Sequence, residues 1–286
     1  MKKVLLSIIL VLLICTQSLA ESSVWKLQKG ESVMYLGGTC HVLRQSDFPL
    51  PVEFHTAYRA SDILVLETDL GKLNDPSIQK KLISEAMYAD GSTIDDHLSS
   101  QTYNLLSEYC ASNGIPIEAV KQFKPSIIAL TMTTMELARL GITQEGVDAF
   151  FFQLATRDKK IVEALETVEE QMHFIVSMGE GNEDAFVTYS IKDLKLIKQV
   201  YESLVDAWKK GDTKKLNDLM IADVKTRTPN LYKELITDRN ENWLPMIDAY
   251  EKTRQREFIL VGVGHLVGPE GIVEALRQKG YKVEKL

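Results

Sequence analysis

The chain has 286 residues, of which 45% are hydrophobic and 26% are charged, and its formal net charge is −7. This length can bury a sizeable core, and the composition is that of a folded protein rather than a disordered one. The excess of acidic side chains argues against nucleic acid and against anionic membrane surfaces as partners.

Residues 1–20 have the pattern of a secretory signal peptide. Lys2 and Lys3 precede an apolar stretch over 4–15, and Ser18-Leu19-Ala20 fits the small-x-small pattern before a cleavage site. The apolar stretch is shorter than the ~20 residues that a membrane-spanning helix needs. We therefore expect cleavage after Ala20, a secreted or periplasmic protein, and no stable membrane insertion. Retention as a membrane anchor is the alternative.

The first strands are expected near the start of the mature chain. The segments WKLQKG and ESVMYLGG predict a β-hairpin with Gly30 in its turn, and residues 54–59 a short helix. The uninterrupted run Ile63-Leu64-Val65-Leu66 is typical of a strand that is covered on both faces, as in a parallel sheet. Glu67 follows this run directly.

The middle of the chain, from about Asp75 to Thr253, has a mostly helical pattern. Capping boxes start at Thr93 and Thr167, and Pro125 and Gly141 bracket another helix. We expect a helix from the first box to about Gly114 and one from the second box to Met178. The remaining expectations are helices over 77–88, 184–210 and 231–250, and a short strand over 160–165.

The C-terminal segment returns to a strand over 258–263, a helix over 270–279 and a strand over 281–283. The simplest assembly places the N-terminal and C-terminal strands in one mixed sheet, with the helical middle as a cover or lid. The expected fold class is therefore α/β (α+β).

Two glycine–histidine motifs lie near the two ends of the mature chain, Gly38-Thr39-Cys40-His41 and Gly262-Val263-Gly264-His265. Both follow apolar, β-prone runs, and the glycines allow a sharp turn and a close approach by a ligand. Since ligands of open α/β sheets bind at the carboxyl ends of strands, a fold that joins the chain ends would bring His41, His265 and Glu67 into one site. Two imidazoles and a carboxylate can bind a divalent metal, with Glu67 as the third ligand or as the base that activates a water molecule.

The ordered series of motifs resembles the TraB/GumN family, which includes plasmid pheromone-shutdown proteins and the animal Tiki proteases. The resemblance runs through YLGGTCHVL, SDILVLETDL, EGVDAFFFQLATRDKKIVEALETVEEQ, ELITDRNENWLPMI and FILVGVGHLVGPEGIVEALRQKGYKVEKL. It marks residues 21–286 as a TraB/GumN-type domain. It also implies an erythromycin-esterase/ChaN-like fold, an α/β sheet surrounded by helices.

The resemblance implies a metal-dependent peptidase in which His41, Glu67 and His265 hold manganese or cobalt. Arg239 and Asn240 match the family's Arg-Asn pair, and an arginine beside a metal can stabilise an oxyanion or hold a substrate carboxylate. Asp148 and Glu166 match further recurrent positions, for which no role is implied.

Two hypotheses for function follow. In the first, the protein is an exported metal-dependent hydrolase, a peptidase, that acts on a peptide or small-molecule substrate through Glu67, Arg239 and Asn240. In the second, it is a non-catalytic protein that binds or sequesters a peptide or haem. A purely structural role is also open, in which Glu67 caps a helix or pairs with Arg239, and Arg239 and Asn240 lie on a helix surface. The oligomeric state is left open.

Cys40 lies next to His41 and therefore raises the question of a thiol nucleophile. Adjacent residues in an extended segment point to opposite faces, so the pair is poorly placed for proton transfer. We do not expect Cys40 to act as a nucleophile.

Overall fold

The centre of the protein is a six-stranded mixed sheet with the strand order β6-β4-β7-β2-β1-β8. The structure is a computed structural model that describes residues 22–286, so the predicted signal peptide lies outside the described residues. The strands of this sheet are β1 (Val24–Lys29), β2 (Ser32–Thr39), β4 (Ile63–Leu66), β6 (Ile161–Ala164), β7 (Glu257–Gly262) and β8 (Lys282–Lys285). A second sheet pairs β3 (Leu43–Arg44) with β5 (Ile142–Thr143). The expected mixed sheet, which joins the two ends of the chain, is confirmed.

The strand directions bring three strand ends to one edge of the sheet. β7 lies between β2 and β4 and runs parallel to both, with Gly38 opposite Val261 and Val65 opposite Ile259. β1 runs antiparallel to β2 and to β8. The segments that follow β2, β4 and β7 therefore leave the sheet side by side, as a site at the strand ends requires.

Helices cover both faces of the sheet and form a separate lobe beyond its edge. Their bounds are α1 (Val52–Ala60), α2 (Pro76–Ala86), α3 (Ile94–His97), α4 (Ser100–Ser112), α5 (Ile117–Val120), α6 (Pro125–Arg139), α7 (Val147–Asp158), α8 (Val168–Ser177), α9 (Glu183–Leu194), α10 (Ile197–Lys209), α11 (Thr213–Met220), α12 (Ala222–Arg227), α13 (Pro229–Tyr232), α14 (Asp238–Ala249) and α15 (Ile272–Gln278). A π-helix, Lys233–Thr237, joins α13 to α14. Within residues 22–286, none of the helices combines the length and the hydropathy that crossing a membrane requires.

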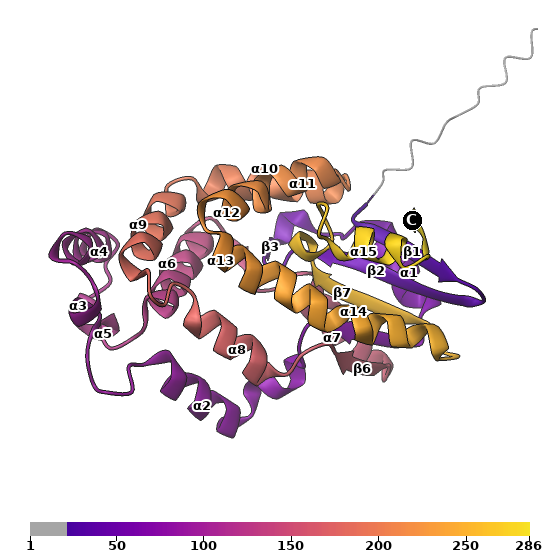
Figure 1. Ribbon diagram of the computed structural model, residues 1–286, viewed down its shortest axis with the longest axis horizontal. Helices are drawn as coiled ribbons and strands as arrows, with labels where there is room; N and C mark the ends of the chain where they lie inside the picture. The colour runs from indigo at the N-terminus through magenta and orange to yellow at the C-terminus, as the bar shows by residue number, and fades with distance from the viewer. Residues whose placement is uncertain (1–21) are drawn as a thin grey trace, which may run out of the picture.

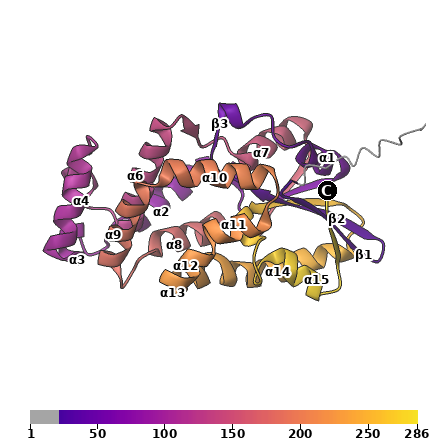
Figure 2. The ribbon, with the colours of Figure 1, turned by 90° about the horizontal axis from the view of Figure 1, so that it is seen from above.

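Alternating strand residues supply the two cores of the sheet. Leu64 and Leu66 belong to the core that α1, α7 and α10 cover, whereas Ile63 and Val65 belong to the core under α14 and α15. Figure 2 shows the sheet between these two helical layers. Since successive side chains of a strand point to opposite faces, the uninterrupted apolar run of β4 is explained by burial on both sides.

A third core holds the helical lobe together and contains no strand residue among those described. It is formed mainly by α4, α6 and α9, whose buried side chains include Leu106, Met132 and Ile191. In Figure 1 this lobe lies at the opposite end of the molecule from the β1–β2 hairpin. The expected helical middle is therefore confirmed, with a core of its own.

Three predicted helices are broken in the structure. The capping box at Thr93 begins only the short α3, because Ser99 forms a second cap with the backbone N–H of Thr102 and starts α4. The expected helix over 184–210 is divided into α9 and α10, since Ile191 packs in the lobe while Val205 packs against the sheet. The expected helix over 231–250 comprises the end of α13, the π-helix and α14, and α11 and α12 were not expected.

Trp208 attaches α10 to the sheet beside the first glycine–histidine motif. Its side chain is fully buried, and its indole N–H donates to the carbonyl oxygen of Gly38 at 2.6 Å. The hydroxyl of Ser23 donates in turn to the carbonyl oxygen of Trp208 at 2.9 Å. A buried carbonyl that loses its donor costs about 1–3 kcal/mol.

We predict that Trp208→Phe destabilises the protein by about 1–2 kcal/mol more than Trp25→Phe. Trp25 is equally buried, and no hydrogen bond of its indole is found within residues 22–286, so both variants lose the same volume but only Trp208→Phe strands a carbonyl. Urea unfolding followed by circular dichroism measures the difference. Equal losses in the two variants would show that the hydrogen bond contributes nothing.

Candidate functional site

The five side chains predicted to form the site meet at the carboxyl edge of the sheet. His41 follows β2, Glu67 follows β4, and His265 lies in the single 3-10 turn after β7. Arg239 and Asn240 stand in the first turn of α14, from which Arg239 reaches Glu67 after β4 and His265 after β7. The parallel arrangement of β2, β7 and β4 is what brings residues from both ends of the chain together.

Glu67 is a buried carboxylate that the fold holds in its ionised form. Only 6% of the residue is exposed; Oε1 accepts a hydrogen bond from the N–H of Gly262 at 2.6 Å, and Oε2 accepts one from Nη2 of Arg239 at 2.5 Å. Burial opposes ionisation, but the neighbouring cationic groups and the Gly262 N–H outweigh it and lower the pKa of Glu67 to about 2. A carboxylate this acidic is a good ligand for a cation and a weak base.

Arg239 bridges the buried acidic groups of the site. Its Nε and Nη2 donate to the two carboxylate oxygens of Glu166 at 3.0 and 2.6 Å, and Nη1 donates to Nε2 of His265 at 3.1 Å. Burial disfavours the charged guanidinium, but Glu67 and Glu166 raise its pKa. The predicted pairing of Glu67 with Arg239 is present, within a network that also includes Glu166.

Asn240 fixes the orientation of the His265 ring. Its Oδ1 lies 2.8 Å from Nδ1 of His265, and its Nδ2 donates to the backbone carbonyl of His265 at 3.2 Å. Burial lowers the pKa of His265 to about 3, so the imidazole is neutral. Because an amide oxygen only accepts, the ring proton is on Nδ1, and Nε2 presents a lone pair. Asn240 is 2% exposed, so its placement on a helix surface is wrong.

Asp148 has the corresponding role at His41. Its Oδ2 lies 2.8 Å from Nδ1 of His41, and the carboxylate raises the pKa of the imidazole. The other ring nitrogen, Nε2, faces Oε1 of Glu67 at 3.8 Å. The His41 side chain is 58% exposed, so this face of the site is open to solvent.

Gly146 explains how Asp148 reaches His41. A Cβ at Gly146 would overlap the backbone carbonyl of His41, so only glycine allows the start of α7 to lie against this segment. The N–H of Val147 donates to the carbonyl of Cys40 at 3.0 Å. Sequence reasoning assigned no role to Asp148 or Glu166, although both stand in the family's series of motifs.

The donor set is suited to a cation, but Arg239 occupies part of it. A Cβ at Gly262 would lie 3.0 Å from Nε2 of His41 and 3.2 Å from Oε1 of Glu67, so the glycine leaves the space between these two donors free of a side chain. Across residues 22–286, no three His, Cys, Asp or Glu side chains are close enough together to hold a metal ion. The guanidinium of Arg239 hydrogen-bonds to both Oε2 of Glu67 and Nε2 of His265.

Cys40 is buried next to this site, and its surroundings do not favour a role as a nucleophile. Burial, with the nearby Asp148 carboxylate as the next cause, raises the pKa of the Cys40 thiol. The thiol is protonated at neutral pH and is a poor nucleophile. Cys110 is buried in the helical lobe, and both cysteines are free.

Comparison with known proteins gives the same family as the motifs. The chain is 24% identical to metalloprotease TIKI1 of Xenopus tropicalis over 93% of its own length and 25% identical to metalloprotease TIKI1 of Homo sapiens over 94%. It is 24% identical to metalloprotease TIKI2 of Xenopus tropicalis over 92% of its length. The chain spans only 62%, 62% and 60% of these relatives.

No solved structure matches the chain, so the expected likeness to the erythromycin-esterase/ChaN-like fold is not confirmed. The sequence pattern of the TraB/PrgY/gumN family, in contrast, matches residues 23–285, nearly the whole described chain. The protein therefore belongs to the TraB/PrgY/gumN family.

Proposed function

We propose that the protein is an exported metal-dependent hydrolase that cleaves peptide substrates. The observation that carries the proposal is the meeting of two imidazoles and one ionised carboxylate at a single sheet edge, with each Nδ1 held by a second polar side chain. The names of the TIKI relatives, which are metalloproteases, support a peptidase.

In this proposal His41, Glu67 and His265 hold a divalent cation, which resemblance to the family suggests is manganese or cobalt. A bound cation of this kind polarises a carbonyl group and lowers the pKa of a water molecule. Asp148 and Asn240 keep the ring protons on Nδ1. Nε2 of His41 is then able to coordinate a cation, and Nε2 of His265 becomes able to do so once Arg239 gives up its hydrogen bond to it. Glu67 acts as a ligand rather than as the base, because both its carboxylate oxygens accept hydrogen bonds, from the N–H of Gly262 and from Arg239, that favour the ionised form.

Arg239 supplies the fixed positive charge of the site. Its hydrogen bonds to Glu166 hold the guanidinium beside Glu67 and His265. A cation held in place in a poorly hydrated site stabilises the negative charge that develops on a carbonyl oxygen under attack. Asn240 is a positioning residue in this scheme, since it contacts His265 through both its amide atoms.

The first prediction concerns metal binding. We expect the wild-type protein to bind manganese, cobalt or zinc stoichiometrically, and His41→Ala and His265→Ala each to lose that binding, since each variant removes one ligand. His97→Ala is the matched control, because His97 stacks on Tyr88 in the helical part of the chain. Titration calorimetry and elemental analysis measure the stoichiometry. Metal binding that survives in both site variants would contradict the proposed ligand set.

The second prediction separates a hydrolase from a binding protein. We expect Glu67→Gln to lower the rate of peptide cleavage by about 100-fold or more, because losing a charged ligand should cost more than the roughly 10-fold to 100-fold lost with an outer-shell partner. Glu31→Gln, a change at an exposed residue of the β1–β2 turn, should have no effect. Peptide cleavage is followed by mass spectrometry, with peptide or haem affinity measured in parallel. A wild-type protein that binds peptide or haem tightly and cleaves nothing would instead identify the non-catalytic alternative.

The third prediction tests the positioning role of Asp148. Asp148→Asn keeps the shape of the side chain but removes the charge that faces His41, so we expect metal affinity to fall by about 10-fold to 100-fold. Glu145→Gln changes an exposed carboxylate just before α7 and should leave the affinity unchanged. Unaltered metal affinity in Asp148→Asn would show that the hydrogen bond to His41 does not influence ligation.

A further inference from the structure

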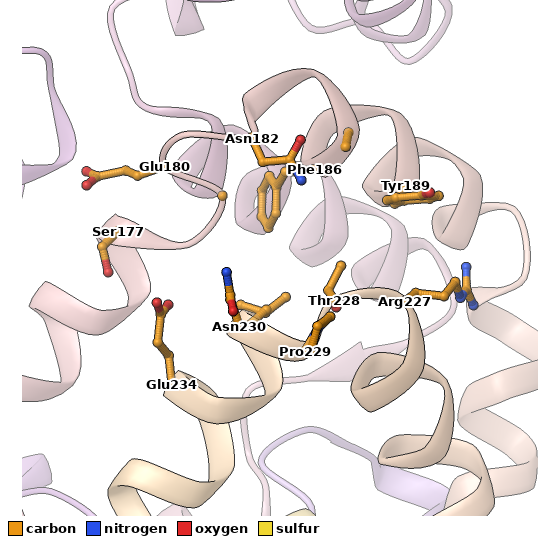
Figure 3. Close-up of a pocket in the computed structure, with 13 residues that line it drawn as sticks. Ser177, Glu180, Asn182, Phe186, Tyr189, Arg227, Thr228, Pro229, Asn230 and Glu234 are labelled. Carbon is orange, nitrogen blue, oxygen red and sulfur yellow. The ribbon is translucent and has the colours of Figure 1, made fainter.

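A cavity of about 300 Å³ lies outside the site, near the ends of α8 and α13. The end of α8 and the loop after it form one wall, α9 forms the next, and the segment from α12 to the π-helix forms the third (Figure 3). This volume is at the lower end of the range for ligand pockets and accommodates one large side chain.

Two helices lead from the site to this cavity. On α8, Nε2 of Gln171 donates to Oε2 of Glu67 at 3.4 Å, and Ser177 lines the cavity. On the other side, the π-helix carries Glu234 at the cavity, and α14, which continues it, carries Arg239 at the site. The Arg239 guanidinium lies 5.7 Å from the ring of Phe174 on α8. Figure 1 shows α8 running beside α13 and α14.

The spacing corresponds to a few residues of an extended peptide. Ser177 is six residues after Gln171 on α8, and a helix rises ~1.5 Å per residue, so these two residues are about 9 Å apart along the helix axis. An extended chain advances ~3.3 Å per residue. A peptide that lies along the two helices with one peptide bond at the site would therefore place a side chain about three residues away in the cavity.

Phe186 provides an apolar wall of the cavity. Figure 3 shows its ring in the cavity, near Asn182 and across from Asn230. A Cβ at Gly179 would overlap this ring, so the glycine allows Phe186 to pack against the loop backbone. An aromatic face of this kind binds the methylene groups of a long side chain and attracts a cationic end group.

Among the charged side chains that line the cavity, Glu234 is the one whose carboxylate is available to pair with a ligand. Glu180 binds Nζ of Lys124 at 3.0 Å, and Arg227 is ion-paired with Asp223. The carboxylate of Glu234 makes no ion pair and no side-chain hydrogen bond with residues 22–286. The ammonium group of the neighbouring Lys233 hydrogen-bonds to both carboxylate oxygens of Asp238, at 2.5 and 2.6 Å.

We propose that this cavity is a specificity subsite that binds a lysine or arginine side chain of a peptide substrate, about three residues from the bond that is cleaved. Phe186 contacts the stem of that side chain and Glu234 pairs with its charge. The peptide nature of the ligand rests on the proposed function, so binding and cleavage are measured separately.

The binding experiment uses three fluorescein-labelled nonapeptides of alanine that carry Lys, Ala or Glu at one position. Fluorescence anisotropy is expected to show that the wild-type protein binds the Lys peptide about tenfold more tightly than the Ala peptide, and the Glu peptide least tightly. Glu234→Gln should remove this preference. Glu241→Gln, a change at an exposed residue of the adjoining α14, should retain it. Equal affinity of the wild-type protein for all three peptides would overturn the subsite, whether or not the variants fold.

The cleavage experiment places lysine at each position of a nonapeptide in turn and locates the cut by mass spectrometry. We expect the wild-type protein to cut about three residues from the lysine and the position of the cut to shift when the lysine is moved. In Glu234→Gln the position of the cut should no longer depend on the lysine. Cleavage without regard to lysine would overturn the subsite and leave the hydrolase standing. Lysine-dependent binding without any cleavage would support the subsite and contradict the hydrolase.

Discussion

The arrangement of the site depends on the hydrogen bonds that the guanidinium group of Arg239 donates. It hydrogen-bonds to Glu67 after β4, to Glu166 after β6 and to His265 after β7, three segments that meet only once the sheet has formed. Removal of one partner from a buried ion pair costs about 3–5 kcal/mol, because the remaining charge is left uncompensated. The same guanidinium therefore ties α14 to Glu67, Glu166 and His265. Burial opposes the ionised form of Glu67, and Arg239 contributes, after His41, to lowering its pKa, so stability and chemistry share one interaction.

The charge balance of the site explains why a cation is compatible with a pocket that already contains an arginine. Glu67 and Glu166 face Arg239, and Asp148 faces His41. Since burial keeps His265 neutral, the carboxylates outnumber the permanent cation. Such an imbalance favours either a protonated His41 or a bound cation, and the two exclude each other because a protonated Nε2 has no lone pair to donate.

Sequence patterns predicted what depends on local chemistry. The apolar run of β4 and the capping box at Thr167 identified their elements, and the strand-end rule indicated that His41, Glu67 and His265 would converge. Periodicity failed over 184–210, because the apolar stripe is continuous although its two halves face different cores. The contacts of Asp148 and Glu166 could not be predicted from the sequence for another reason. Each of the two residues lies 73 or more residues from its partner in the chain, and only the folded sheet brings them together.

The adjacent residues Arg239 and Asn240 contact the two ring nitrogens of the same histidine, His265. Consecutive residues of an α-helix point about 100° apart, so two neighbours on α14 approach the His265 ring from different sides. Asn240 reaches Nδ1 and Arg239 reaches Nε2, so both ring nitrogens are engaged. The contact of Asn240 with Nδ1 fixes the tautomer that metal ligation needs. The hydrogen bond from Arg239 to Nε2, in contrast, occupies the lone pair that a cation would use. Metal binding by His265 therefore requires Arg239 to give up one hydrogen bond, while its paired bonds to Glu166 can keep the guanidinium within the site.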